Sequence, residues 1–209
     1  MKKILYIEAS PRKKRSSSIV ISHFFLDAYK HKHPQDTITS LDLWKAELPS
    51  FDGKIIDVKY AIMHNQPYSE AEAHAWKKVE AIIEEFKSAD KYIISLPMWN
   101  FGIPYILKQY IDLLVQPGYT FTVSKEQGYV GLVTGKPVLL IYSRGGAYGA
   151  GSGAEAFDLQ KQYMEAILKF IGFTQFHSIV IEPTLSGEEK KEQAIRAAET
   201  KAASLAATF

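Results

Sequence analysis

Five short apolar runs of the strand type alternate with helical patterns along the chain, and this alternation constrains the fold more than any other feature. The strand-type runs cover residues 3–7, 37–43, 92–96, 138–142 and 176–181. Apolar residues at helical spacing occupy residues 19–29, 69–88, 104–114, 157–171 and 186–205. This repeat predicts an α/β domain in which five parallel strands form a doubly wound sheet with helices on both faces.

Local signals support several helix boundaries. Ser69 and Glu72 form a capping-box pattern, Pro104 suits the first turn of a helix, and Gly172 suits a helix end. Two segments depart from the alternation: residues 49–67 are interpreted as a long connection with some apolar residues, and residues 119–133 as a short hairpin. Because no repeat, low-complexity segment or linker divides the chain, we expect residues 1–209 to form a single domain.

Composition excludes several classes of function. The chain has 209 residues, 46% of them hydrophobic, and a net charge of +2, so nothing favours nucleic acid or a membrane as partner. No run approaches the ~18 apolar residues of a membrane helix, and the first apolar run stops at Glu8, too early for a secretion signal. Cysteine is absent, which excludes thiolate chemistry and fits a reducing compartment. We therefore expect a cytoplasmic protein.

Polar and glycine-rich segments follow the first, third and fourth predicted strands. We name them the serine loop (residues 10–18, SPRKKRSSS), the aromatic loop (residues 97–104, PMWNFGIP) and the glycine loop (residues 143–153, SRGGAYGAGSG). In an open parallel sheet, ligands bind outside the carboxyl ends of the strands, where the strand order reverses. The sequence therefore predicts a ligand site built from these three loops.

The serine loop combines four cationic residues with three hydroxyls at the start of a helix. Free amides and hydroxyls at a helix start suit a phosphate, because hydrogen bonds to an anion contribute about 1.5–3 kcal/mol each. The P-loop pattern and its lysine are absent, which argues against a triphosphate with magnesium. An ordinary serine N-cap after a solvated basic loop, residues 12–15, explains the same pattern.

The aromatic loop places two aromatic rings and a thioether at the predicted ligand edge. Such side chains suit a flat conjugated ring, and Asn100 offers both a donor and an acceptor for its polar rim. The alternative is a hydrophobic plug over the sheet end or a dimer contact.

The glycine loop supplies backbone amides that can approach a planar ligand without obstruction and can stabilise negative charge on it. Gly149, Gly151 and Ala154 match a dinucleotide fingerprint, but they lie too far after the strand, and Glu182 is too distant to be its acidic partner. A plain mobile loop explains residues 149–153 equally well. The six histidines show no metal-ligand spacing, so we predict no metal site. No G-x-S-x-G elbow is present, which argues against hydrolase chemistry by that route.

Further motifs accompany the three loops. Leu107 to Asp112 has the pattern L-K-x-Y-[IF]-D, Thr120-Phe121 is a T-F pair, and Gly131 to Lys136 is G-L-V-T-G-K. Together with the spaced serines, P-M-W-N-F and S-R-G-G, they resemble the FMN-dependent NADH-azoreductase family, flavodoxin-like homodimers related to the NAD(P)H quinone reductases. The resemblance covers nearly the whole chain. That family has Tyr more often than Trp at position 99.

The resemblance implies a flavodoxin-like fold and one FMN per subunit. Residues implied to bind FMN are Ser10, Ser16, Ser17, Ser18, Pro97, Met98, Trp99, Asn100, Phe101, Ser143, Arg144, Gly145 and Gly146. Phe121 and Tyr148 are weaker candidates for substrate contacts, and Phe121 with residues 49–67 is a candidate for completing the partner subunit's pocket. The role of residues 12–15 is not implied.

The implied activity is ping-pong hydride transfer from NADH through FMN to quinones, or to aromatic azo compounds that are cleaved to amines. A flavodoxin-like electron carrier without small-molecule turnover is the alternative, and a non-redox phosphate-ligand module is a third reading. Flavodoxin-like electron carriers tend to be smaller and strongly acidic, whereas this chain has 209 residues and a net charge of +2.

Overall fold

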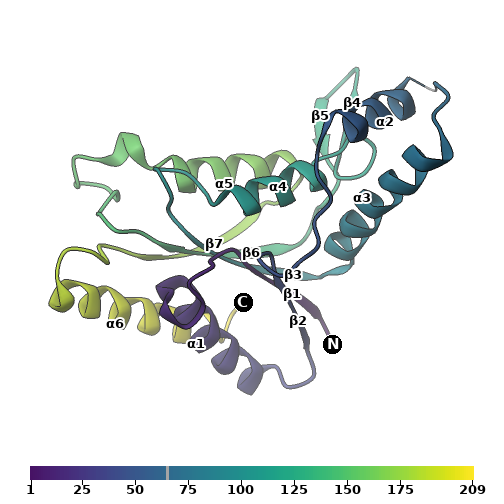
Figure 1. Cartoon of the computed structure of the whole chain (residues 1–209). Helices are drawn as coiled ribbons and strands as arrows, with labels where there is room; N and C mark the ends of the chain where they lie inside the picture. The colour runs from purple at the N-terminus through teal and green to yellow at the C-terminus, as the bar shows by residue number, and fades with distance from the viewer. Residues whose placement is uncertain (65) are drawn as a thin grey trace.

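A computed structural model describes residues 1–64 and 66–209. Within them, five strands form one parallel sheet, as predicted (Figure 1). The strand order is β2 (Thr37–Asp42), β1 (Lys3–Glu8), β3 (Lys91–Pro97), β6 (Pro137–Ser143) and β7 (Gln175–Ile181). Because the chain moves from β1 outward to β2 and then returns to β3, the direction of winding reverses between β1 and β3.

Helices cover both faces of the sheet (Figure 1). One face carries α1 (Ser17–Lys32) and α6 (Glu188–Leu205), and the other carries α3 (Glu70–Ser88), α4 (Tyr105–Leu114) and α5 (Leu159–Phe170). The capping box at Ser69 and Glu72 is formed, and Gly172 follows α5 with a positive φ of 117°. The predicted doubly wound architecture is therefore confirmed.

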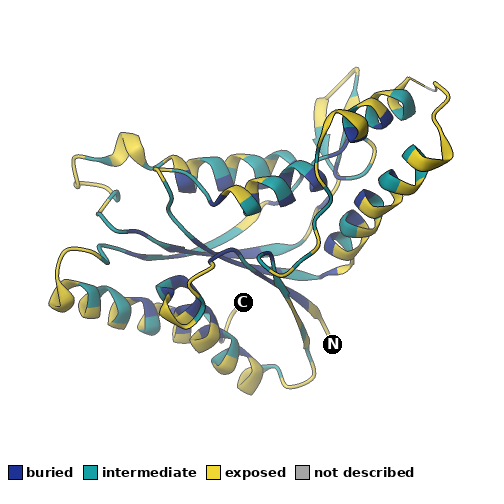
Figure 2. Cartoon of the chain, in the orientation of Figure 1, coloured by how far each residue is buried: buried dark blue, intermediate teal, exposed yellow. Residues whose placement is uncertain are grey.

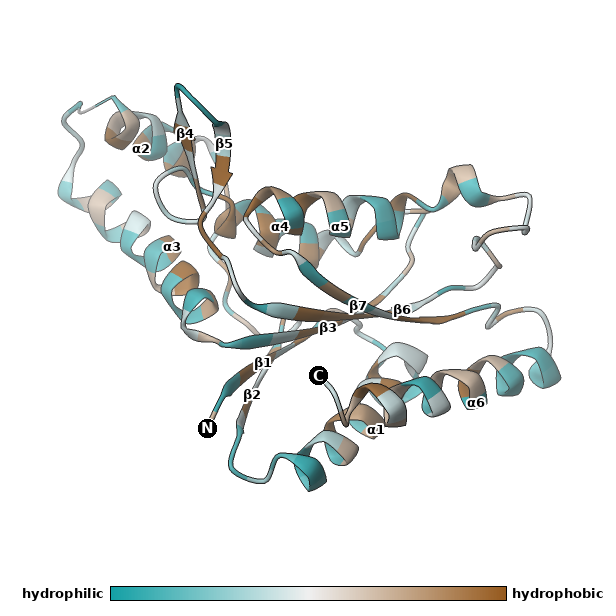
Figure 3. Ribbon diagram, turned by 180° about the vertical axis from the view of Figure 1, so that it is seen from behind, coloured by the Kyte–Doolittle hydropathy of each residue, from teal (hydrophilic) through white to brown (hydrophobic). Residues whose placement is uncertain are grey.

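The central strands β1, β3 and β6 are mostly apolar between their ends because both of their faces are covered. In β1, Ile4 and Tyr6 pack toward α1 and α6, whereas Leu5 and Ile7 pack toward the opposite layer. Figure 2 shows the resulting buried centre, and Figure 3 shows that the same strands are the hydrophobic part of the fold.

The segment interpreted as a long connection contains a helix, α2 (Gly53–Met63), that the sequence interpretation missed. Asp52 caps it by accepting hydrogen bonds from the amides of Lys54 and Ile55. Only Ile55 and Val58 of this helix are buried, so its apolar stripe is short. Residue 65, within the same segment, lies outside the described residues.

The predicted hairpin is confirmed as β4 (Phe121–Ser124) paired antiparallel with β5 (Gly128–Gly131). Its base lies against the end of α5: a Cβ at Gly131 would stand 2.3 Å from the backbone nitrogen of Gly172. Only glycine allows this approach, because any side chain would push the two backbones apart.

Candidate functional site

The serine loop leaves the carboxyl end of β1 and enters α1 through a single 3-10 turn, Lys13–Arg15. Ser10, Ser16 and Ser18 are buried, and the Oγ atoms of Ser16 and Ser18 lie 3.1 Å apart. Ser17 is half-buried and lines a groove of about 550 Å³ that Arg12, Lys14 and Arg15 also line. The loop therefore presents hydroxyls next to a cationic groove.

The start of α1 lacks the side-chain cap that three other helices of this fold have. In the described part of the chain, Asp52, Ser69 and Asp158 each accept a hydrogen bond from the helix that they precede. Ser16 occupies the same position before α1 but accepts none. The first amides of a helix have no acceptor within it, so those of α1 remain available to an anion. The interpretation of Ser16 as an ordinary N-cap is thus not supported by the geometry.

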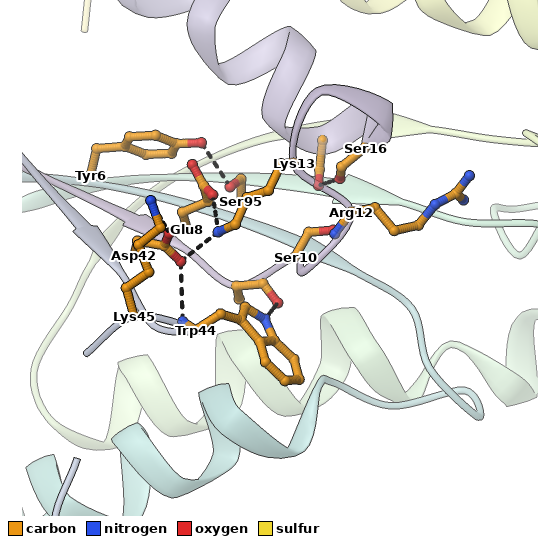
Figure 4. A network of polar contacts seen from close by, with 12 residues as sticks. Tyr6, Glu8, Ser10, Arg12, Lys13, Ser16, Asp42, Trp44, Lys45 and Ser95 are labelled. Carbon is orange, nitrogen blue, oxygen red and sulfur yellow. Dashed lines mark hydrogen bonds and ion pairs between the residues drawn. The ribbon is translucent and has the colours of Figure 1, made fainter. Parts of the chain in front are cut away.

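Lys13 is the one member of the basic run that pairs with carboxylates among the described residues. Its Nζ lies 2.5 Å from Glu8 Oε1 and 2.5 Å from Asp42 Oδ1 (Figure 4). Burial alone would lower the pKa of Lys13, but the hydrogen bonds to Asp42 and Glu8 outweigh it and raise the pKa above its ordinary value. Lys13 also adopts a positive φ of 49°. It therefore holds the loop to β1 and β2 rather than facing a ligand.

The aromatic loop is a tight turn in which Trp99 and Gly102 exchange two backbone hydrogen bonds. The two residues between them, Asn100 and Phe101, have positive φ angles of 48° and 66°. Asn tolerates this conformation, but a bulky residue such as Phe rarely adopts it, and such strain gathers at functional sites. Phe101 is 42% exposed, so the strained residue presents its ring outward.

The glycine loop is held by the buried side chain of Arg144. Its guanidinium donates to Asp158, Gln160 and Glu182, at 2.6, 3.0 and 3.2 Å. Glu182 also accepts hydrogen bonds from the amides of Tyr148 and Gly149. Arg144 is among the residues predicted to bind the cofactor, and in the structure its side chain is engaged by these protein groups.

Two glycines of this loop have amides without a hydrogen-bond acceptor among the described residues. The amides of Gly145 and Gly146 donate to no other backbone group in the described residues. A Cβ at Gly145 would lie 2.8 Å from the Leu185 side chain, and one at Gly146 would lie 3.3 Å from the Tyr148 hydroxyl. Glycine therefore lets the backbone pass beside Leu185 and Tyr148 at the carboxyl end of β6, with two amides left for a ligand to use.

Backbone hydrogen bonds join the three loops into one edge. The amide of Ala9, which precedes Ser10, donates to Ser95 O, and the amide of Met98 donates to Ser143 O. Phe101 packs against Tyr148 and Phe157, with ring centroids 6.1 and 4.9 Å apart. The structure thus brings the predicted cofactor residues and Tyr148 to one end of the sheet.

Phe121 lies elsewhere in the chain. Its ring packs against Tyr129 and Phe170, at 6.0 and 4.8 Å between centroids, on the hairpin beside α5. Phe121 therefore packs on the hairpin and α5 and not against the three loops of its own subunit.

Sequence reasoning missed the residues that hold the loops in place: Asp42, Trp44, Asp158, Gln160 and Glu182. Asp158 and Glu182 are separated from Arg144 by 14 and 38 positions, so no local pattern links them. Trp44 offered a signal, because it is a large aromatic residue directly after a predicted strand.

The donor set matches the parts of FMN. Buried hydroxyls and uncapped amides suit its phosphate, and aromatic side chains with unbonded glycine amides suit the flat ring and its polar edge. Within residues 1–64 and 66–209, no cluster of His, Asp and Glu is arranged to hold a metal ion. No helix among these residues combines the length and apolarity needed to cross a membrane.

Comparisons with known proteins agree with this geometry. The family described as "flavodoxin-like fold" matches residues 2–205. The FMN-dependent NADH:quinone oxidoreductase of Nitratidesulfovibrio vulgaris is 51% identical over 94% of either chain.

Two solved structures from Bacillus anthracis are also similar. One is an azoreductase with a TM-score of 0.92, 34% identity and full coverage of both chains. The other is an FMN-dependent NADH-azoreductase in complex with FMN, with a TM-score of 0.87, 28% identity, and coverage of 99% of this chain and 100% of that one. The chain therefore belongs to the flavodoxin-like-fold family that contains the FMN-dependent NADH:quinone oxidoreductases and azoreductases.

Proposed function

We propose that this protein is an FMN-dependent NADH oxidoreductase that reduces quinones and cleaves aromatic azo compounds. The observation that carries the proposal is the meeting of the three loops at one sheet edge, with an uncapped helix start in the serine loop and, in the glycine loop, two glycine amides that have no acceptor among the described residues. Bound FMN would supply the hydride chemistry between NADH and the acceptor.

The serine loop would hold the phosphate. Ser10, Ser16 and Ser18 are buried hydroxyls, and Ser17 stands beside the groove with Arg12 and Arg15. Hydrogen bonds to a charged acceptor contribute about 1.5–3 kcal/mol each, more than the ~0.3–1 kcal/mol that a surface helix dipole contributes. Hydroxyls and amides therefore dominate, and the arginines add a longer-range attraction for anions.

The aromatic and glycine loops would hold the ring. Met98, Trp99 and Phe101 supply apolar area, while Asn100 and the Gly145 and Gly146 amides supply donors for its polar rim. Amides that are already oriented can stabilise negative charge without reorganisation, which favours a reduced, anionic ring over an oxidised one. We assign no side chain to acid–base catalysis.

A homodimer is part of the proposal. An apolar groove of about 670 Å³ opens beside the aromatic loop, between α4 and α5. Its lining includes Phe51, Ile103, Tyr105 and Leu159, and the last two are 64% and 50% exposed. A second copy would cover this face. Its Phe121 would then lie near the flavin pocket of the first subunit, which the first subunit's own Phe121 does not reach. Light scattering on the purified protein tests this, and a monomer at micromolar concentration would contradict it.

We also propose the cytoplasm as the location, on the grounds of the cysteine-free composition. Comparing the flavoprotein in fractionated cells tests this part separately.

Purification followed by a turnover assay tests the activity. We expect yellow protein that releases FMN on denaturation and oxidises NADH only when menadione or methyl red is present. Bound flavin without turnover of either acceptor would indicate an electron carrier instead. Colourless protein that takes up no added FMN would contradict the proposal.

A further inference from the structure

We infer that Trp44 is a positioning residue that couples the two halves of the flavin site, fixing the serine loop with its indole N–H and the aromatic loop with its ring. The inference rests on the proposed function, since it concerns how the chain arranges the same FMN site. Trp44 follows β2 and belongs to none of the three loops.

The indole N–H of Trp44 holds the start of the serine loop. Nε1 donates to the carbonyl oxygen of Ala9 at 3.0 Å (Figure 4). The amide of the same Ala9 donates to Ser95 O at 3.0 Å. Both backbone polar groups of Ala9, the residue that precedes Ser10, are thereby bonded, the amide to β3 and the carbonyl oxygen to Trp44.

The backbone of Trp44 is tied to the same loop through Asp42. Asp42 Oδ1 accepts from the Trp44 amide at 3.1 Å and from Lys13 Nζ at 2.5 Å (Figure 4). One carboxylate oxygen thus links the residue after β2 to the 3-10 turn of the serine loop. Trp44 is therefore connected to that loop directly through Ala9 and indirectly through Asp42.

The ring of Trp44 contacts the other half of the site. Its centroid lies 5.9 Å from that of Trp99 and 5.3 Å from that of Tyr105, with the Tyr105 ring edge-on at 82°. Trp99 and Tyr105 are themselves 6.3 Å apart, so the three rings form a cluster. Trp99 is the residue proposed to lie against the flavin, and the Trp44 ring packs against Trp99.

The two contacts can be separated by substitution. Trp44→Phe retains an aromatic ring but removes the N–H, whereas Trp44→Leu removes both. Riboflavin lacks the phosphate of FMN, so the ratio of the two affinities reports on the serine loop, while riboflavin affinity alone reports on the ring end. A residue that only stabilised the fold would change both affinities by the same factor.

The experiment titrates apoprotein with FMN and with riboflavin, following quenching of flavin fluorescence. For Trp44→Phe we expect FMN affinity to fall about three- to ten-fold, as for one lost hydrogen bond, with riboflavin affinity within about two-fold of the wild type. For Trp44→Leu we expect both affinities to fall. Trp76→Phe is the matched control. Trp76 lies on α3, away from the three loops, and its Nε1 likewise donates a hydrogen bond, to the Tyr119 hydroxyl.

The inference is wrong if Trp44→Phe lowers FMN and riboflavin affinity equally, if it lowers neither, or if Trp76→Phe shows the same FMN-selective loss. None of these outcomes would contradict the proposed function. Wild-type protein that bound FMN no more tightly than riboflavin would instead remove the proposed phosphate site, and the inference with it. If Trp44→Phe does not fold, Asp42→Asn decides in the same assay, with an FMN-selective loss expected and an unselective or absent loss contradicting the inference.

Discussion

The serine loop and the glycine loop are both held by one cation between two carboxylates, but the two cations lie in different surroundings. Lys13, between Glu8 and Asp42, has a side chain that is 37% exposed, whereas Arg144, between Asp158 and Glu182, is 1% exposed. Water screens the first arrangement and not the second. The serine loop, proposed to bind the phosphate, is therefore held by adjustable surface charges, and the glycine loop, proposed to bind the ring, by a fixed buried network.

This difference fits what each end is proposed to bind. A phosphate spreads its charge over three terminal oxygens and tolerates small shifts of its hydrogen-bond donors. Charge on a ring edge instead needs amides at set positions. The comparison predicts that the same kind of substitution has unequal effects in the two loops.

The largest effect is expected for Arg144→Met. Removing the buried guanidinium leaves Asp158 and Glu182 without their partner, so the free energy of unfolding should fall by about 3–5 kcal/mol. Urea denaturation measures this. Arg196→Met, which breaks the exposed pair with Glu192, is the control and should change stability by at most about 0.5 kcal/mol. A loss below 1 kcal/mol in Arg144→Met would remove the contrast between the loops.

Ser17→Glu addresses the ligand side of the serine loop. A carboxylate at this position would repel a phosphate and remove a hydroxyl, so FMN affinity should fall about 100-fold while riboflavin affinity stays within about three-fold. Fluorescence titration of apoprotein measures both. Ser17→Ala is the control, with a loss of about ten-fold or less expected for FMN. An equal loss for both flavins would place Ser17 away from the phosphate.

Glu182→Gln weakens the glycine loop from within. The neutral amide can accept from the Tyr148 or Gly149 amide, but it no longer compensates Arg144, so stability should fall by about 1–2 kcal/mol. FMN and riboflavin affinities should fall by the same factor, because the ring end is disturbed. Glu189→Gln, at an exposed position of α6, is the control. A change confined to FMN would contradict this assignment.

The smallest effect is expected for Lys13→Met, at about 1 kcal/mol or less, since the pair is partly exposed. The pKa of Lys13 is raised in the folded state, so its stabilisation is fully present below the unfolded pKa of about 10.4 and is lost as pH rises through the higher folded value. The stability difference from wild type should thus be constant from pH 7 to pH 10 and shrink above it. A difference that shrinks toward pH 7 would contradict the pairing.

The fold and the meeting of the three loops at one sheet edge could be predicted from the sequence because both depend on local patterns. Continuous apolar strands require cover on both faces, and the loops after β1, β3 and β6 carry residues such as Trp99 and Gly145 that suit few other purposes. The helix α2 escaped because it buries little and is flanked by Pro49 and Pro67.

The residues that hold the loops could not be predicted, because their contacts span the chain. Glu182 looks like any acid after a strand, and only the folded chain brings it to Arg144 and to the amides of Tyr148 and Gly149. Lys13 likewise gave no sign of its positive φ or of its carboxylate partners. Sequence thus indicates which groups meet a ligand, while long-range pairing decides which groups keep them in place.

The uncapped start of α1 has a consequence for the life of the protein in a cell. A ligand that binds only the folded chain stabilises it by about 4 kcal/mol at a concentration 1,000 times its Kd. Flavin supply would then set how often the chain opens, so protein made during riboflavin shortage would be degraded sooner than the same protein made in its presence.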